Sequence, residues 1–362
     1  MRMNVYLTTG KKNYKYAYVA IKSLFEHNRD SEIYLYIVSE DLEESDLNYE
    51  YELAKQYGNH IIILRFDEER ASKQVKLRAT DHWAIGTMSS YWLFHELLPE
   101  EVDRIIVIES DTVVVGDLSE IYQTDFEDAY VICPGSEHKP KSHRDFMESI
   151  GGECLTFVLS MYDVNRIRKD FTLEEILKTD EYIRTKAGNS MMELTFGLLF
   201  KGNIKYIPGQ ISCIDENERY IEELGYDYLV ECEKTARIIH FSSYSDYSKP
   251  WNPVFLVPGY AKWWEYAVDS PYYKEYIERQ WTYYNKTRKK QKEIAKNISY
   301  RNILIMAMIF MTGVIAVLSL LTDAGILGSI VVIGCAVLSL AASVAIRRFS
   351  IFIGKVIEKA RR

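Results

Sequence analysis

The stretch Ile105-Ile106-Val107-Ile108-Glu109-Ser110-Asp111-Thr112 places two carboxylates directly after an apolar run. Such a run predicts a buried β-strand, and side chains two positions apart share one face of a strand. We therefore expect Glu109 and Asp111 to leave the carboxyl end of this strand together. Carboxylate oxygens suit a hard cation such as Mg²⁺ or Mn²⁺, which neutralises the phosphate oxygens of a nucleotide. Acidic residues at strand ends are also common without any ion, so the pattern alone leaves both interpretations open.

A second polar residue leaves an apolar run 129 residues after Asp111, in Arg237-Ile238-Ile239-His240-Phe241. The imidazole of His240 could add a nitrogen ligand to the same cation, or it could be a hydrogen-bonded residue of the core. Downstream, Lys249-Pro250-Trp251 combines a turn with a positive charge. Lys249 could bind phosphate as a point charge, or it could simply lie on the surface.

Strand and helix patterns alternate on both sides of the acidic stretch, which predicts an α/β fold with a parallel sheet covered by helices on both faces. In such sheets ligands bind beyond the carboxyl ends of the strands, where the polar residues above are found. No GxGxxG or Walker sequence is present, so dinucleotide and P-loop chemistry have no support. The expected strands are 5–8, 32–38, 61–64, 104–108, 155–160, 204–207 and 238–241, and the expected helices include 16–25, 41–57 and 88–98.

Charge is distributed unevenly along the 362-residue chain. It contains 44 Lys and Arg against 52 Asp and Glu, yet residues 286–362 carry 13 basic and 3 acidic residues, a net charge of +10. Residues 1–285 therefore carry a net charge of −18. Such an acidic body repels polyanions, which argues against nucleic acid as a partner.

The basic C-terminal part predicts a membrane anchor. Residues 303–321 and 324–346 carry no charge, and each segment is long enough to cross a hydrocarbon core of about 30 Å as a helix. Basic residues flank both outer ends, so the positive-inside rule predicts a multi-pass protein with two spans, contacts to membrane lipids, and catalytic domain and termini in the cytoplasm. A buried hairpin is the alternative. The expected parts are a body (1–285), a basic linker (286–302), the two-helix hairpin (303–346) and a basic amphipathic tail (347–362).

Taken together, the ordered motifs of residues 4–280 resemble glycosyltransferase family 8, retaining enzymes of the GT-A fold that use UDP-sugars. The resemblance implies an α/β fold with a mixed, mainly parallel sheet. The resemblance is carried by Asn4-Val5-Tyr6-Leu7-Thr8-Thr9, Leu97-Leu98-Pro99-Glu100, Glu109-Ser110-Asp111-Thr112-Val113-Val114-Val115-Gly116-Asp117-Leu118-Ser119-Glu120, Leu199-Phe200-Lys201-Gly202, Ile238-Ile239-His240 and Lys249-Pro250-Trp251.

The resemblance implies a role for several of these positions. Glu109, Asp111 and His240 take the place of the manganese ligands, and Lys249 that of a diphosphate contact. Thr8 and Thr9 fall where the uracil and ribose are held, and Ser110 is grouped with these donor contacts. The implied cofactors are Mn²⁺ (or Mg²⁺) and a UDP-sugar donor such as UDP-glucose or UDP-galactose.

The chain also departs from the family pattern. Glu109 stands where the family has Asp, and the family's N-A-G segment appears as Thr156-Phe157-Val158, which loses an amide that usually touches the donor sugar. Leu93 stands where the family has an arginine. The D-Q-D motif appears near Met191-Met192-Glu193-Leu194, so Glu193 aligns at or beside the catalytic position. That carboxylate could stabilise an oxocarbenium-like transition state or trap it covalently, or it could be a solvated helix residue.

Three functions follow from these patterns. The first is a metal-dependent retaining glycosyltransferase that moves a hexose to a lipid-linked or cell-envelope glycan at the cytoplasmic membrane face. The second is a catalytically degenerate UDP-sugar-binding membrane protein that acts as a partner or scaffold, which the rewritten sugar-side motifs favour. The third is a haloacid-dehalogenase-like phosphatase, which is disfavoured because that chemistry needs an aspartate nucleophile where this chain has Glu109.

Overall fold

The computed structural model describes residues 1–75, 89–135, 139, 141–187, 192–208, 213–215, 222–242, 249–252 and 259–321. The chain divides into two compact units, Met1–Glu278 and Arg279–Arg362. In the part that the structure describes, the strands are β1 (Arg2–Thr8), β2 (Glu32–Ser39), β3 (His60–Arg65), β4 (Arg104–Val107), β5 (Thr112–Val114), β6 (Val131–Pro134), β7 (Met161–Asp163), β8 (Ile204–Ile207), β9 (Cys213–Asp215) and β10 (Ile238–His240).

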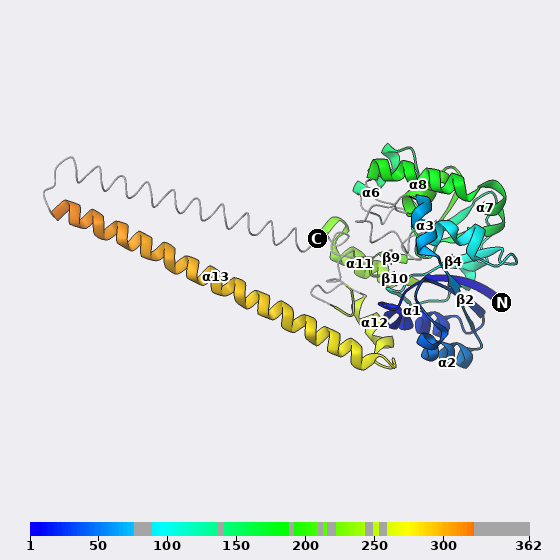
Figure 1. Cartoon of the computed structure of the whole chain (residues 1–362), viewed down its shortest axis with the longest axis horizontal. Helices are drawn as coiled ribbons and strands as arrows, with labels where there is room; N and C mark the ends of the chain where they lie inside the picture. The colour runs from blue at the N-terminus through cyan, green and yellow to red at the C-terminus, as the bar shows by residue number, and fades with distance from the viewer. Residues whose placement is uncertain are drawn as a thin grey trace. The chain divides into compact units, whose positions relative to one another are not determined.

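Helices alternate with these strands along the first unit, as Figure 1 shows. They are α1 (Tyr14–His27), the 3₁₀ turn η1 (Glu44–Leu47), α2 (Asn48–Tyr57), α3 (Glu68–Val75), the π-helical η2 (Leu93–Leu97), α5 (Ser119–Tyr122), α6 (Lys141–Ser149), α7 (Val164–Asp170), α8 (Leu173–Ala187), α9 (Met192–Leu199), α11 (Tyr226–Glu233), α12 (Tyr260–Ala267) and α13 (Tyr273–Leu321).

The described strands form a seven-stranded sheet of order β3-β2-β1-β4-β7-β6-β8 and a three-stranded sheet of order β5-β10-β9. In the large sheet, β1 pairs in parallel with β2 and β4, β2 with β3, and β6 with β8, whereas β7 runs antiparallel to β4 and β6. The prediction of an α/β fold with a mixed, mainly parallel sheet is therefore confirmed.

Two apolar clusters cover the two faces of the large sheet. Successive residues of β1 alternate between them, with Val5 and Leu7 in the first cluster and Tyr6 in the second. Helices α1 and α2 and the small sheet contribute to the first cluster, and η2, α7, α8 and α9 to the second. This alternation is what buries every strand residue from Met3 to Leu7, each of them nearly inaccessible to solvent.

The prediction of a strand at residues 155–160 is wrong. The chain reaches an extended conformation only at Met161, where β7 begins. Leu159 has a φ of 65°, a left-handed conformation that no β-strand contains. The backbone therefore turns at this residue before it joins the sheet.

The prediction of a multi-pass membrane protein is also wrong. Within the residues that the structure describes, no helix combines the length and the apolar character needed to cross a membrane. Residues 303–321 form the end of the 49-residue helix α13, which begins at Tyr273, rather than a separate apolar helix. The second predicted span (324–346) and the amphipathic tail (347–362) lie outside the described residues.

Candidate metal and nucleotide site

The backbone brings two distant segments of the chain to one point. Strand β4 ends at Val107, and the hydroxyl of Thr112 donates a hydrogen bond of 2.8 Å to the carbonyl of Glu109, which closes a turn around Ser110 and Asp111. The chain then continues as β5, antiparallel to β10, with Thr112 directly opposite His240. The amide of Phe241 donates to the carbonyl of Asp111 at 3.0 Å. The register of the small sheet thus fixes the imidazole beside the acidic turn.

The side chains of Glu109, Asp111 and His240 meet in this corner. Nε2 of His240 lies 2.8 Å from Oε2 of Glu109 and 3.5 Å from Oδ1 of Asp111. One ligand atom of each residue lies within 4.8 Å of the others. The side chain of Glu109 is 36% exposed, whereas those of Asp111 and His240 are 17% and 10% exposed. The corner is therefore open on the side of Glu109 and closed behind the other two.

Lys249 is the fourth charged group of this corner. Its ammonium group donates to Oδ2 of Asp111 and, at 2.5 Å, to the carbonyl oxygen of Phe241. Burial by itself would raise the pKa of Asp111, but the positive charges of Lys249 and His240 outweigh it and hold that pKa below its usual value. Asp111 is therefore a carboxylate at any physiological pH.

The donor set fits a divalent cation. Two carboxylates and an imidazole are ligands that Mn²⁺ accepts, and Mg²⁺ accepts the oxygens. The remaining positions of an octahedral ion would face the open side, toward solvent or the oxygens of a phosphate. The corner has space for a cation only if His240 and Glu109, now in direct contact, separate slightly to accept it.

The predicted nucleotide contacts lie at the end of the neighbouring strand β1. The hydroxyl of Thr8 donates to that of Tyr6 at 2.6 Å, and the Tyr6 hydroxyl lies 3.2 and 3.3 Å from those of Ser89 and Ser90. The hydroxyl of Thr9 is buried and has no hydrogen-bond partner among the described residues. The structure leaves Ser110 partly exposed in the turn between Glu109 and Asp111.

Glu193 is not part of the cluster formed by Glu109, Asp111 and His240. It lies half-buried in the first turn of α9. Its charge adds to the effect of burial in raising the pKa values of Cys154 and Tyr162, so it stands near these two residues. Its predicted catalytic role stays a prediction.

The sequence did not identify Tyr6 as a site residue, although its hydroxyl accepts a hydrogen bond from that of Thr8. A signal was present, because Tyr6 and Thr8 are two positions apart in a predicted strand and so share a face. It also missed the carbonyl of Phe241, which holds Lys249 and which no side-chain pattern could reveal.

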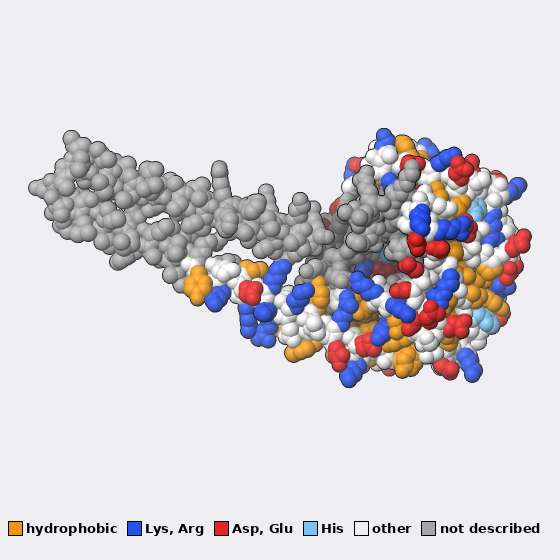
Figure 2. Space-filling view, in the orientation of Figure 1, with side chains coloured by type: hydrophobic (Ala, Val, Ile, Leu, Met, Phe, Trp, Pro, Cys, Tyr) orange, Lys and Arg blue, Asp and Glu red, His pale blue; other side chains and the backbone are white. Residues whose placement is uncertain are grey.

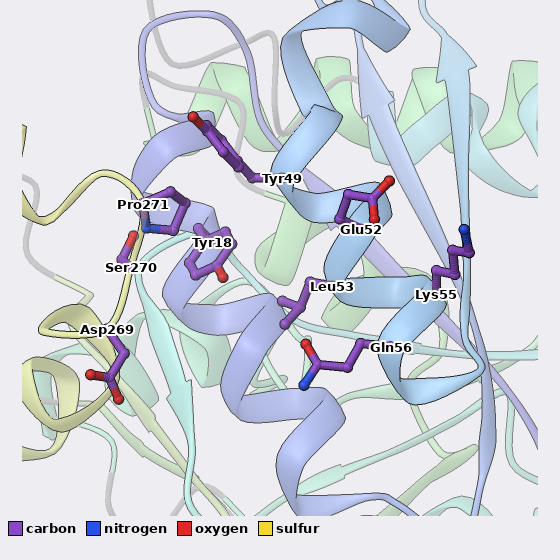
Figure 3. Close-up of a pocket in the computed structure, with 9 residues that line it drawn as sticks. All are labelled: Tyr18, Tyr49, Glu52, Leu53, Lys55, Gln56, Asp269, Ser270 and Pro271. Carbon is purple, nitrogen blue, oxygen red and sulfur yellow. The ribbon is translucent and has the colours of Figure 1, made fainter.

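A separate groove lies between α1, α2 and the turn before α13 (Figure 3). The residues that line it are Tyr18, Tyr49, Glu52, Leu53, Lys55, Gln56, Asp269, Ser270 and Pro271. None of the predicted site residues is among those that line it. On the face of the first unit that Figure 2 shows, acidic and basic side chains are interspersed.

Comparisons with known proteins agree with this geometry. The family model described as "Glycosyl transferase family 8" matches residues 4–254. The lipopolysaccharide 1,2-glucosyltransferase of Escherichia coli is 22% identical over 243 residues, which are 65% of this chain and 69% of that protein.

Two solved structures share the fold. The galactosyltransferase LgtC, in complex with donor and acceptor sugar analogues, superposes with a TM-score of 0.59 at 15% identity, over 74% of this chain and 96% of its own. The glycosyltransferase GlyE of Streptococcus pneumoniae TIGR4 gives a TM-score of 0.57 at 15% identity, over 79% of this chain and 64% of its own.

Proposed function

The chain belongs to glycosyl transferase family 8, and from this premise we propose that it is a retaining glycosyltransferase that moves a hexose from a UDP-sugar to a cell-envelope glycan. The observation that carries the proposal is the convergence of Glu109, Asp111 and His240 on one point, with Lys249 beside them. Glu109 and Asp111 repel each other, and in the absence of a metal ion His240 and Lys249 offset this repulsion.

Each group has a part in the proposed reaction. Glu109, Asp111 and His240 would hold the cation, which when bound offsets the charge of the diphosphate. Lys249 contributes a second positive charge at the same place, and Thr8 and Thr9 lie where β1 ends, within the expected nucleoside site. The bond between the anomeric carbon and the diphosphate oxygen breaks, its electron pair stays on UDP, and the acceptor oxygen bonds to that carbon and loses its proton.

The identity of the donor and the acceptor rests on relatives. The Escherichia coli protein is named as a glucosyltransferase that acts on lipopolysaccharide, and LgtC is named as a galactosyltransferase. We propose UDP-glucose or UDP-galactose as the donor for this reason. We also propose Glu193 as the carboxylate of the reaction centre, because it aligns at or beside the catalytic position of the family's D-Q-D motif; it lies half-buried in the first turn of α9.

Titration calorimetry and a transfer assay test this function. Wild-type protein should bind UDP in the presence of Mn²⁺ and release radiolabelled hexose from a UDP-hexose, whereas Asp111→Ala should do neither. Glu120→Ala is a matched control, because Glu120 is the last residue of the motif that begins at Glu109 but is not part of the cluster formed by Glu109, Asp111 and His240. Equal binding and turnover in wild type and Asp111→Ala would refute the assignment of the site.

A degenerate protein that binds UDP-sugars without transferring them is the second candidate. Leu93, at the position of the expected arginine, is 1% exposed and belongs to the apolar core. No charge can therefore act from that position. Tight binding of UDP and Mn²⁺ without hydrolysis or transfer to any of a panel of glycans would favour this second function.

A further inference from the structure

Lys249 depends on the backbone that carries it for its place in the acidic corner. A lysine side chain is a point charge on a flexible stem, so its ammonium group stays at one position only where its backbone is fixed. The ammonium group of Lys249 donates to Asp111 and to the carbonyl oxygen of Phe241, and 14% of the side chain is exposed. The contacts that fix the segment Lys249-Pro250-Trp251 therefore also fix a positive charge of the candidate site.

Trp251 packs into a layer of aromatic rings two residues after Lys249. Its side chain is 5% exposed, and its ring stacks on that of Tyr16 in α1 with 4.2 Å between ring centroids and 11° between planes. It also meets the ring of Trp263 in α12, with 5.7 Å between centroids. Aromatic pairs of this kind stabilise a structure beyond the burial of their area, so they hold Trp251 in one position.

Trp264 of α12 holds the neighbouring residue, Pro250. Its indole N–H donates a hydrogen bond of 3.1 Å to the carbonyl oxygen of Pro250, and its ring meets that of Trp263 edge to face with 5.2 Å between centroids. The amide of Asn252 donates to the carbonyl oxygen of Lys249 at 2.8 Å, which closes a turn. The segment that carries Lys249 is thus held through its side chains and through its backbone.

The first turn of α13 contributes a further ring to this layer. The ring of Tyr276 stacks on that of Tyr16, with 5.6 Å between centroids and 28° between planes, and lies 5.2 Å from that of Trp263. The hydroxyl of Tyr276 donates to the carbonyl oxygen of Lys15 and accepts a hydrogen bond of 3.2 Å from the hydroxyl of Ser270. Helices α1, α12 and α13 therefore all support the layer.

We propose that Trp251 and Trp264 are positioning residues, which hold the ammonium group of Lys249 where it contacts the diphosphate of the donor. This inference rests on the proposed function. The two tryptophans contact the segment that carries Lys249, and neither belongs to the cluster of predicted cation ligands. Their effect on donor binding is therefore confined to the diphosphate, and the uridine part of the donor binds independently of them.

Two ligands separate the diphosphate from the nucleoside. With Mn²⁺ present, calorimetry should show that UDP binding is weakened about ten- to hundredfold by Lys249→Ala and about three- to tenfold by Trp251→Leu. Trp264→Phe, which keeps a ring but loses the indole hydrogen bond, should weaken UDP binding about two- to fivefold. An NMR titration should show unchanged binding of uridine in all three variants. Phe126→Leu is the matched control, because Phe126 is also 5% exposed in the same apolar cluster but lies against the guanidinium group of Arg104, and it should change neither affinity.

Double variants test whether the tryptophans act through the lysine. In the Lys249→Ala background, Trp251→Leu and Trp264→Phe should cause no further loss of UDP affinity, because the contact that they support is already absent. Trp264 is half-buried, so Trp264→Phe gives the answer if Trp251→Leu does not fold.

Three results would overturn the role of the two tryptophans. These are an unchanged UDP affinity in Trp264→Phe, an equal loss of UDP and uridine affinity, which shows a general structural role, and a further loss of UDP affinity in the Lys249→Ala background. If the wild type did not bind UDP, or if Lys249→Ala bound it as the wild type does, the proposed function itself would be contradicted and this inference with it, so the two failures are distinguishable.

Discussion

Replacement of Glu50 by glutamine should remove the pH dependence of the free energy of unfolding that this buried carboxyl group causes. Glu50 is fully buried in the first turn of α2, and both of its carboxyl oxygens accept from the hydroxyl of Tyr272, at 3.1 and 3.3 Å. The ring of Tyr272 meets those of Tyr18 and Tyr49 edge to face. The carboxyl group therefore lies in a tyrosine-rich environment, and two of these tyrosines, Tyr18 and Tyr49, line the groove of Figure 3.

The magnitude follows from the change in pKa. Burial raises the pKa of Glu50 from 4.5 to about 7, and the hydrogen bond from Tyr272 opposes this rise only in part. A group whose pKa is higher in the folded than in the unfolded state stabilises the fold fully below the unfolded pKa, and this contribution is lost as the pH rises through the folded pKa. Between pH 5 and pH 8 the loss amounts to about 2.5 kcal/mol, at about 1.4 kcal/mol for each pH unit of difference.

Urea denaturation at pH 5 and pH 8 measures this loss. The free energy of unfolding of the wild type should fall by about 2.5 kcal/mol more than that of Glu50→Gln over this range. Glu52→Gln, on the exposed face of the same helix, is the matched control and should behave as the wild type. Equal pH dependence in wild type and Glu50→Gln would refute the reasoning, since Glu50 would then titrate at an ordinary pKa.

Three further predictions concern the site and its supports. Mn²⁺ at a hundred times its dissociation constant should raise the free energy of unfolding of the wild type by about 2.7 kcal/mol and leave Asp111→Ala unchanged, as measured by denaturation with and without the ion. Gly197→Ala should cost about 2 kcal/mol in a urea titration, because the new Cβ would lie 2.2 Å from the carbonyl oxygen of Glu153, and a neutral result would show that α9 can shift freely. Asn28→Ala should cost about 1–3 kcal/mol in the same titration, because the buried amide of Leu118 loses the side-chain acceptor that it has at 2.8 Å; no change in stability would mean that water replaces this acceptor.

The sequence predicted the large sheet and the geometry of the acidic corner for identifiable reasons. The apolar run before Glu109 and the run before His240 each specify a strand, and residues at the carboxyl ends of strands gather at one edge. Their meeting follows from the antiparallel register of Thr112 against His240, which no local pattern specifies. The spacing therefore predicted which residues would approach, but not which sheet would bring them together.

Tertiary structure decided the remaining features. The apolar run at 155–160 has the composition of a strand, yet Leu159 adopts a positive φ because Val107 holds the backbone on both sides of the bend. Residues 303–321 have the composition of a membrane span, yet they continue a helix that begins thirty residues earlier with charged turns. In both segments the composition correctly predicted apolar residues. It did not predict that the first segment turns before the sheet, or that the second continues a longer helix.

The third predicted ligand belongs to the small sheet, whereas the large sheet closes with β8 at Ile207. Both carboxylates follow β4, so they belong to a part of the chain that precedes β10. Only when β10 inserts between β5 and β9 does the corner gain its nitrogen. A chain that ended before residue 238 would lack this imidazole, and its candidate cation site would retain only the two carboxylates.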